Sequence, residues 1–219
     1  LRLNRLVGRH LPSFGHGGGA GPAAMSPGLA QAIDSAQTGV RRRFSVTTQR
    51  AMQVTTPAML EELHQRKQAL KKAAATPEER ATIEIVALLF QSILTEDRIP
   101  ASVRVWFARL QMPVLRVAVS EPDFFATVDH PARRLIDRMG ACVMGFDNSA
   151  QVGEALEKEI KRIVQVVEAY PDTGRRVFQT VLTEFEKFLE QYFEKENQAS
   201  AKGVSLAQQV EQRETMAIQ

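Results

Sequence analysis

A shortage of cysteine is the first feature of this sequence. One cysteine among 219 residues cannot close an intramolecular disulfide. The fold must therefore be held together by packing, and the single thiol fits a reducing compartment such as the cytoplasm. Long apolar runs are missing too, because Arg or Glu interrupts each one before the roughly 18–20 residues of a membrane-spanning helix. We therefore expect a cytoplasmic protein without membrane insertion.

Metal-binding and phosphate-binding motifs are also missing. The four histidines, His10, His16, His64 and His130, do not have the spacing of metal ligands. The glycine cluster GHGGGAGP at 15–22 is followed by no Lys-Ser/Thr pair and preceded by no apolar strand, so we interpret it as a linker. No set of Ser, His and Asp can be picked out for nucleophilic catalysis. The sequence thus predicts no metal site and no cofactor.

Positive charge is concentrated near the beginning of the chain. Residues 1–50 carry a net charge of +6, while the remainder carries −3. The first part is rich in Gly, Pro, Ser and Ala, and it cannot bury enough apolar surface to offset the entropy lost on ordering. We therefore predict a disordered basic linker, or tether, over residues 1–55, which could hold a short helix around Pro27 to Thr38.

The arginines of this linker suggest two binding roles. They could contact nucleic acid, but only non-specifically and through residues 1–50, since contacts with phosphate groups carry no sequence information. The segment RRRFS at 41–45 also places Ser45 three residues after Arg42, a pattern that resembles a basic-directed kinase site. A solvated basic tether that touches an acidic partner is the simpler interpretation.

From Thr56 onward the pattern is helical. Thr56 and Thr76 each precede a proline and a first turn that contains Glu, which is typical of a helix N-terminus. Apolar residues then recur every three or four positions. We predict an all-α domain over residues 56–219, a bundle of antiparallel helices that is incomplete at its C-terminal end. Its helices begin at about 57, 77 and 131, and two more, over about 154–170 and 174–196, form a hairpin across the turn YPDTG.

The most apolar stretch, IPASVRVWFARLQMPVLRVAVS at 99–120, has two interpretations. The alternation of Val103, Val105 and Phe107 could indicate a strand. The continuing set of apolar residues through Leu110 fits a helix better, with Pro113 removing one backbone donor and bending it. We predict a bent, buried helix.

The segment DHPARRLIDRMGACVMGFD at 129–147 contains the strongest candidates for a site. On a helix that begins at Pro131, Cys142 falls on the apolar arc and Arg133 and Arg134 fall on the polar arc. Two interpretations stay open: a buried lattice of arginines and carboxylates that joins helices, which we favour, or an anion or nucleotide site made by His130, Arg133, Arg134 and the helix N-terminus. Cys142 is predicted to be an inert core thiol with a raised pKa, and we expect no catalytic residue.

Three segments resemble a known family. They are RLQMPVLRVAVSEPDFF at 109–125, HPARRLIDRMG at 130–140, and the long segment at 155–196 that begins ALEKEIKRIVQVV. Together they are similar to the bacterial DUF1631 family, a domain of unknown function, from about residue 55 to the end. Members are sometimes labelled thymidine phosphorylase, but this sequence has neither the phosphate-binding residues nor the α/β alternation that the label requires.

The expected function follows from abundant helix signals and scarce catalytic ones. We expect a non-enzymatic interaction or regulatory module that binds an unidentified protein partner in the bacterial cytosol. Since the chain begins with Leu and its last segment, SLAQQVEQRETMAIQ, stops in mid-pattern, we interpret it as an internal fragment of a larger protein.

Overall fold

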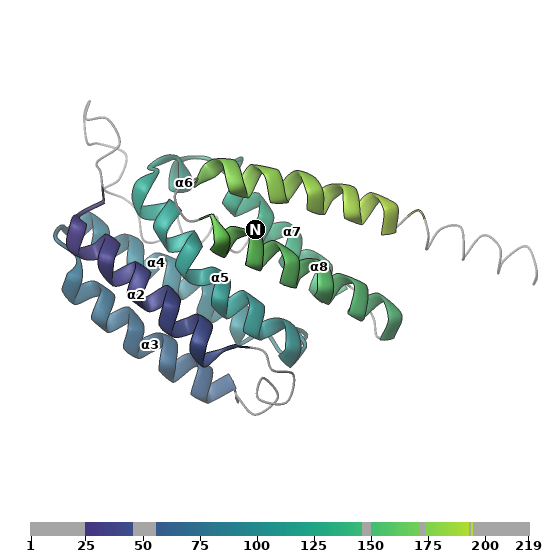
Figure 1. The fold of residues 1–219 in the computed structure, drawn as a ribbon, viewed down its shortest axis with the longest axis horizontal. Coiled ribbons are helices and arrows are strands. Elements are labelled where there is room, and N and C mark those ends of the chain that lie inside the picture. Colours follow the sequence, from purple (N-terminus) through teal and green to yellow (C-terminus); the bar gives the residue numbers. More distant parts are fainter. Residues whose placement is uncertain (1–24, 46–55, 146–149, 171–173, 193, 195–219) are drawn as a thin grey trace, which may run out of the picture. The chain divides into compact units, whose positions relative to one another are not determined.

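The computed structural model describes residues 25–45, 56–145, 150–170, 174–192 and 194. Every regular element in these ranges is a helix, which confirms the all-α prediction. Figure 1 shows the helices α2 (Pro27–Arg43), α3 (Thr56–Ala73), α4 (Pro77–Leu94), α5 (Ala101–Ser120), α6 (Asp123–Ala126), α7 (Pro131–Gly145) and α8 (Ala150–Ala169), and a further helix follows over residues 175–192. None of the described helices is both long enough and apolar enough to span a bilayer.

Helix α5 lies at the centre of the fold. It contacts α2, α3, α4, α6 and α8, and fourteen of its twenty residues are buried. A helix that is covered on all sides needs apolar residues around its whole circumference, so its sequence loses the helical period and looks partly like a strand. The helix prediction for this stretch is confirmed, and α5 continues through Pro113; the bend stays a prediction.

Helix α2 lies where the sequence analysis placed part of a disordered linker. It packs against α3 and α5, and Leu29, Ile33, Val40 and Phe44 are at most 1% exposed. These residues recur at helical spacing, and small residues between them let α2 approach its neighbours closely. The short helix that the linker could hold around Pro27 to Thr38 is therefore present and extends to Arg43. Disorder was the wrong expectation for these residues, because α3 and α5 cover the apolar side of α2. Residues 1–24 and 46–55 lie outside the described residues.

The start of α4 confirms a predicted helix cap and adds a contact that was not predicted. Thr76 accepts a hydrogen bond from the Glu79 backbone N–H at 3.1 Å, as an N-cap should. The Glu79 carboxylate in turn accepts hydrogen bonds from the Ser26 N–H at 2.9 Å, the Ser26 hydroxyl at 2.8 Å and the Ala75 N–H at 2.8 Å. One carboxylate therefore joins the beginnings of α2 and α4, which are more than fifty residues apart.

The predicted apolar stripes are buried, while the antiparallel order of the helices stays a prediction. Gly174, with a φ of 47°, stands just before the last described helix, at the end of the predicted turn. The predicted helix beyond residue 196 lies outside the described residues. The stripe residues that are buried are Ile83, Val86, Leu89, Phe90 and Leu94 in α4, Leu156, Ile160, Ile163, Val164 and Val167 in α8, and Phe178, Val181, Leu182, Phe185 and Leu189 in the last helix.

Candidate functional site

His130 lies at the N-terminus of α7 with both ring nitrogens bonded inside the protein. Its Nδ1 accepts a hydrogen bond from the Ala132 backbone N–H at 3.1 Å, so Nδ1 carries no proton. Its Nε2 therefore bears the hydrogen and donates it to Glu121, 2.6 Å away. The ring is fully buried and lies edge-on to Phe124. His130 thus caps α7 and fixes the loop before it, and no ring nitrogen is left to hold a ligand.

Arg133 is buried, although the helical pattern placed it on the polar arc. The loop before α7 covers its side chain, which is 3% exposed, and its Nη1 donates to the carbonyl oxygens of Phe124 at 3.3 Å and Thr127 at 3.0 Å. Burial lowers the pKa of this guanidinium, and the carboxylate of Asp137 partly offsets the effect. Arg134, the third candidate, is half-buried. The hydrogen bonds of Arg133 go to backbone carbonyls, and the predicted lattice of arginines and carboxylates and the alternative anion site both stay predictions.

Cys142 is half-buried on α7. Burial raises the pKa of its thiol, and the positive charge of Arg138 only partly offsets this. A raised pKa reduces the fraction of thiolate, which is the reactive form. His130, twelve residues earlier in the chain, has both ring nitrogens engaged as described above, so it cannot activate this thiol. The predicted core position is met only in part, because the side chain is half-buried, and the inertness of the thiol stays a prediction.

A buried ion pair joins α5 to α8, and the sequence analysis did not predict it. The guanidinium of Arg109 donates from Nη2 to Glu168 Oε1 at 2.6 Å and from Nε to Oε2 at 3.3 Å. The two side chains are 8% and 1% exposed, and Arg109 also lies over the ring of Trp106, 4.7 Å from its centroid. Glu168 directly follows Val167, a residue of the apolar stripe of α8. A charged residue at the border of such a stripe is the sequence feature from which a buried ion pair could have been predicted.

A largely apolar hollow of about 460 Å³ opens between α4 and α7. We call it the α4–α7 hollow. Leu89, Ile99 and Ile136 form its buried floor, and Ile93, Ala141 and Met144 are more exposed. Glu96, Arg98 and Asp137 also line it and supply its charged groups. This size lies within the range of small ligand pockets, about 300–1,000 Å³.

Metal chemistry receives no support from the part of the chain that the structure describes. There, His, Cys, Asp and Glu side chains form no group of three or more that could hold an ion. His130 and Cys142 do not form a pair of base and nucleophile, because both ring nitrogens of His130 are hydrogen-bonded and the pKa of the Cys142 thiol is raised. Of the features described so far, the α4–α7 hollow is the one with the size of a binding pocket.

Comparison with protein families decides what the chain is related to. The family model described as the second domain of a protein of unknown function, DUF1631, matches residues 23–174. The chain belongs to the DUF1631 family. No curated protein and no solved structure matches it. The DUF1631 match begins just before α2 and ends at residue 174, so it includes a helix that the sequence-based resemblance, taken from about residue 55, had left out.

Proposed function

We propose that this chain is a non-enzymatic, helical interaction module of a larger bacterial cytosolic protein, and that it binds a partner through the α4–α7 hollow. The matching family model describes a second domain, which supports a module within a longer protein. The residues that could serve chemistry support the same view, since His130 caps a helix and the thiol of Cys142 has a raised pKa. The hollow offers apolar surface that an isolated domain gains nothing from exposing.

One glycine carries the argument for this surface. Gly140 lines the hollow in the interior of α7, and a Cβ added there would meet no atom within 4 Å. Glycine inside a helix is less stable than alanine by about 1 kcal/mol. Nothing in the described structure requires that cost, because no neighbour of Gly140 would clash with a methyl group. A partner that approaches α7 closely would account for it; Gly153 of α8 is equally open, and what distinguishes Gly140 is that it lines the hollow.

The shape and charge of the hollow indicate the kind of partner. Two carboxylates, Glu96 and Asp137, and one guanidinium, Arg98, line it, so its charged groups sum to −1. Arg98 donates from Nε to Glu96 at 2.8 Å, which leaves Asp137 as the carboxylate best placed to meet a partner's positive charge. We therefore propose that the occupant is a helix of a partner protein that inserts a large apolar side chain and places Lys or Arg beside it.

A pair of glycine variants tests this proposal. Gly140→Leu places a large side chain at the hollow, where an added Cβ would meet no atom within 4 Å, and Gly153→Leu makes the same change on α8, where a Cβ would also meet nothing within 4 Å. The probes are three synthetic amphipathic peptides with one Leu/Phe anchor and basic, neutral or acidic flanking residues. We expect the basic peptide to bind the full chain best in fluorescence anisotropy, and Gly140→Leu to weaken it by about tenfold or more.

The matched control makes the result interpretable. Gly153→Leu should bind the basic peptide as the wild type does, and both variants should melt at or above the wild-type temperature. Equal loss in both variants, or no preference for basic flanks, would contradict the proposed surface. Failure of all three peptides to bind would contradict the proposed class of partner.

A further inference from the structure

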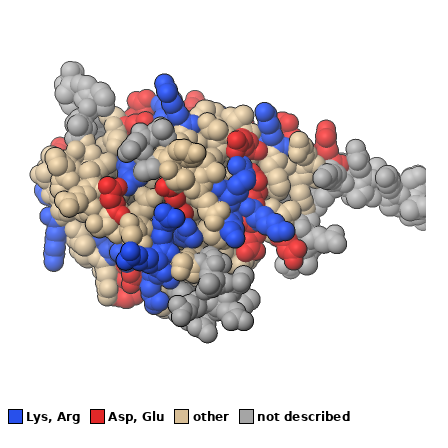
Figure 2. All heavy atoms as spheres, viewed as in Figure 1, with Lys and Arg blue, Asp and Glu red and all other residues tan. Residues whose placement is uncertain are grey.

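A second hollow lies beside the C-terminal end of α2, and its lining is basic. It has a volume of about 410 Å³ and is lined by Thr38, Arg41, Arg42, Ser45 and Arg109. We call it the arginine hollow. The first four residues come from the end of α2 and the residues after it, and Arg109 comes from α5. Figure 2 shows basic side chains gathered over this end of α2, whose last turn contains Arg41, Arg42 and Arg43.

The charges in and beside the arginine hollow do not cancel. Among the residues that the structure describes, three guanidinium groups line it and no carboxylate does. Glu168 lies next to it, paired with Arg109 and 3.7 Å from Arg41 Nε, but its side chain is 1% exposed. Counting this one carboxylate leaves a net charge of +2. The C-terminal end of α2 contributes a partial charge of only about −0.5, so positive charge prevails.

The fold gives these arginines fixed positions, which the sequence did not suggest. Arg41 to Arg43 belong to α2, and Phe44, which follows them, is 1% exposed. Ser45 donates a hydrogen bond from its hydroxyl to the Arg42 carbonyl at 3.0 Å. A protein kinase needs its substrate segment to leave the fold and extend, and burial of Phe44 opposes that. The same contacts fix the backbone that carries the three exposed arginines, so their side chains leave from adjacent positions, which favours binding of an anion over modification of Ser45.

The chemistry of the lining indicates the class of ligand. Guanidinium groups bind phosphate oxygens in pairs of charge-assisted hydrogen bonds, and hydroxyl groups such as those of Thr38 and Ser45 can rotate to donate as well. The described residues that line the hollow include no aromatic side chain that could stack on a nucleobase, so the phosphate is the group they would recognise. We propose that the arginine hollow binds a small phosphorylated molecule through its phosphate group. This site is separate in chemistry from the α4–α7 hollow, and neither proposal depends on the other.

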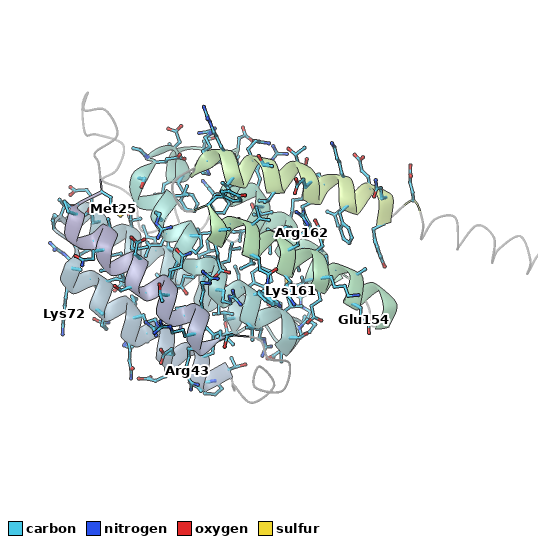
Figure 3. All side chains as sticks on the ribbon, in the orientation of Figure 1. Met25, Arg43, Lys72, Glu154, Lys161 and Arg162 are labelled. Carbon is cyan, nitrogen blue, oxygen red and sulfur yellow. The ribbon has the colours of Figure 1, made fainter. Side chains whose placement is uncertain are left out.

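Neighbouring arginines provide a matched test. Arg42 lines the hollow and Arg43 does not, yet both are exposed and both belong to the last turn of α2, where Figure 3 labels Arg43. The full chain, Arg42→Gln and Arg43→Gln are titrated with inorganic phosphate and pyrophosphate by isothermal calorimetry at constant ionic strength. We expect Arg42→Gln to weaken binding by about tenfold or more, because one charge-assisted hydrogen bond contributes about that factor. Arg43→Gln should change it less than about twofold, since this arginine contributes only general charge.

Comparing the two variants distinguishes a specific phosphate site from a general attraction of anions to the basic surface. Equal weakening by both variants would show that the basic surface attracts anions without a site, and would overturn the proposal. Absence of measurable binding to either probe by the wild-type chain would overturn it as well. Unchanged melting temperatures and helical circular dichroism in both variants would confirm that any loss belongs to the ligand, because neither side chain is buried.

Discussion

Removing one partner of the Arg109–Glu168 pair is expected to destabilise the fold strongly. The guanidinium and the carboxylate make two hydrogen bonds, at 2.6 and 3.3 Å, and their side chains are 8% and 1% exposed. Glu168→Gln keeps the shape and removes the negative charge, so the charge of Arg109 stays buried without its counter-charge. Breaking a buried pair in this way costs about 3–5 kcal/mol. For a domain of this size that corresponds to a fall in Tm of roughly 6–20 °C.

A double variant distinguishes the net contribution of the ion pair to the free energy of unfolding from the cost of leaving one charge buried without a partner. Arg109→Met with Glu168→Leu removes both charges and keeps apolar bulk between α5 and α8. Buried pairs replaced in this way are often neutral or even stabilised, so we expect the double variant to lie within about 1 kcal/mol of the wild type. The assay is urea unfolding followed by circular dichroism at 222 nm, with thermal melts as a second measure.

An exposed pair on the same helix serves as the control. Arg116 of α5 bonds to Asp34 of α2, whose side chain is 70% exposed, so Asp34→Asn should cost less than about 1 kcal/mol. The reasoning is refuted if Glu168→Gln is no less stable than Asp34→Asn. It is refuted equally if the double variant is as unstable as the single one, because the loss would then come from packing rather than from an unpaired charge.

Two further predictions concern pH and reactivity. Burial alone would raise the pKa of Glu79, but hydrogen bonds from Ser26 and Ala75 outweigh it, so the pKa lies below the ordinary value of 4.5. The stabilisation by a carboxylate of lowered pKa is complete above the unfolded value and disappears as pH falls through the folded value. Glu79→Gln should therefore cost about 1–3 kcal/mol at pH 7, and the difference should shrink below about pH 4.5 in urea unfolding; a difference independent of pH would contradict this. Because burial raises the pKa of the Cys142 thiol, iodoacetamide at pH 7.5 should alkylate the folded chain more slowly than the urea-unfolded chain, as read by mass spectrometry; equal rates would exclude the inert thiol.

Local patterns predicted the helices after residue 55 well, because caps and apolar spacing act within a few residues. Thr76 caps α4 as expected, and the buried stripe of α8 from Leu156 to Val167 follows the predicted positions. The central helix was harder, since α5 is surrounded and its sequence has little polar face to mark the period. Helix α2 was expected only as a possible short helix within a linker for the opposite reason, because its own apolar residues are few and one of the helices that bury them, α5, lies far along the chain.

At the candidate site, too, local sequence patterns predicted the residues, and tertiary contacts decided their hydrogen-bond partners. The sequence identified His130 and Arg133 as a cluster beside a loop. The structure shows which atoms they bond: a backbone N–H, the Glu121 carboxylate, a carbonyl of α6 and the carbonyl of Thr127 that follows it. These partners could not be read from a helical wheel, which places side chains around one helix and contains no information about a loop that folds back over it.

The sequence by itself determined that this chain is helical, which residues of each helix are apolar, and that the familiar catalytic and metal motifs are missing. Only the tertiary structure decided that α2 belongs to the core, that Glu79 joins two helix starts, and that Arg42 and Arg109, far apart in sequence, line one hollow. The reason is physical. Propensity, capping and spacing operate over one or two turns of a helix, whereas buried ion pairs and hollows depend on which surfaces meet after the helices pack.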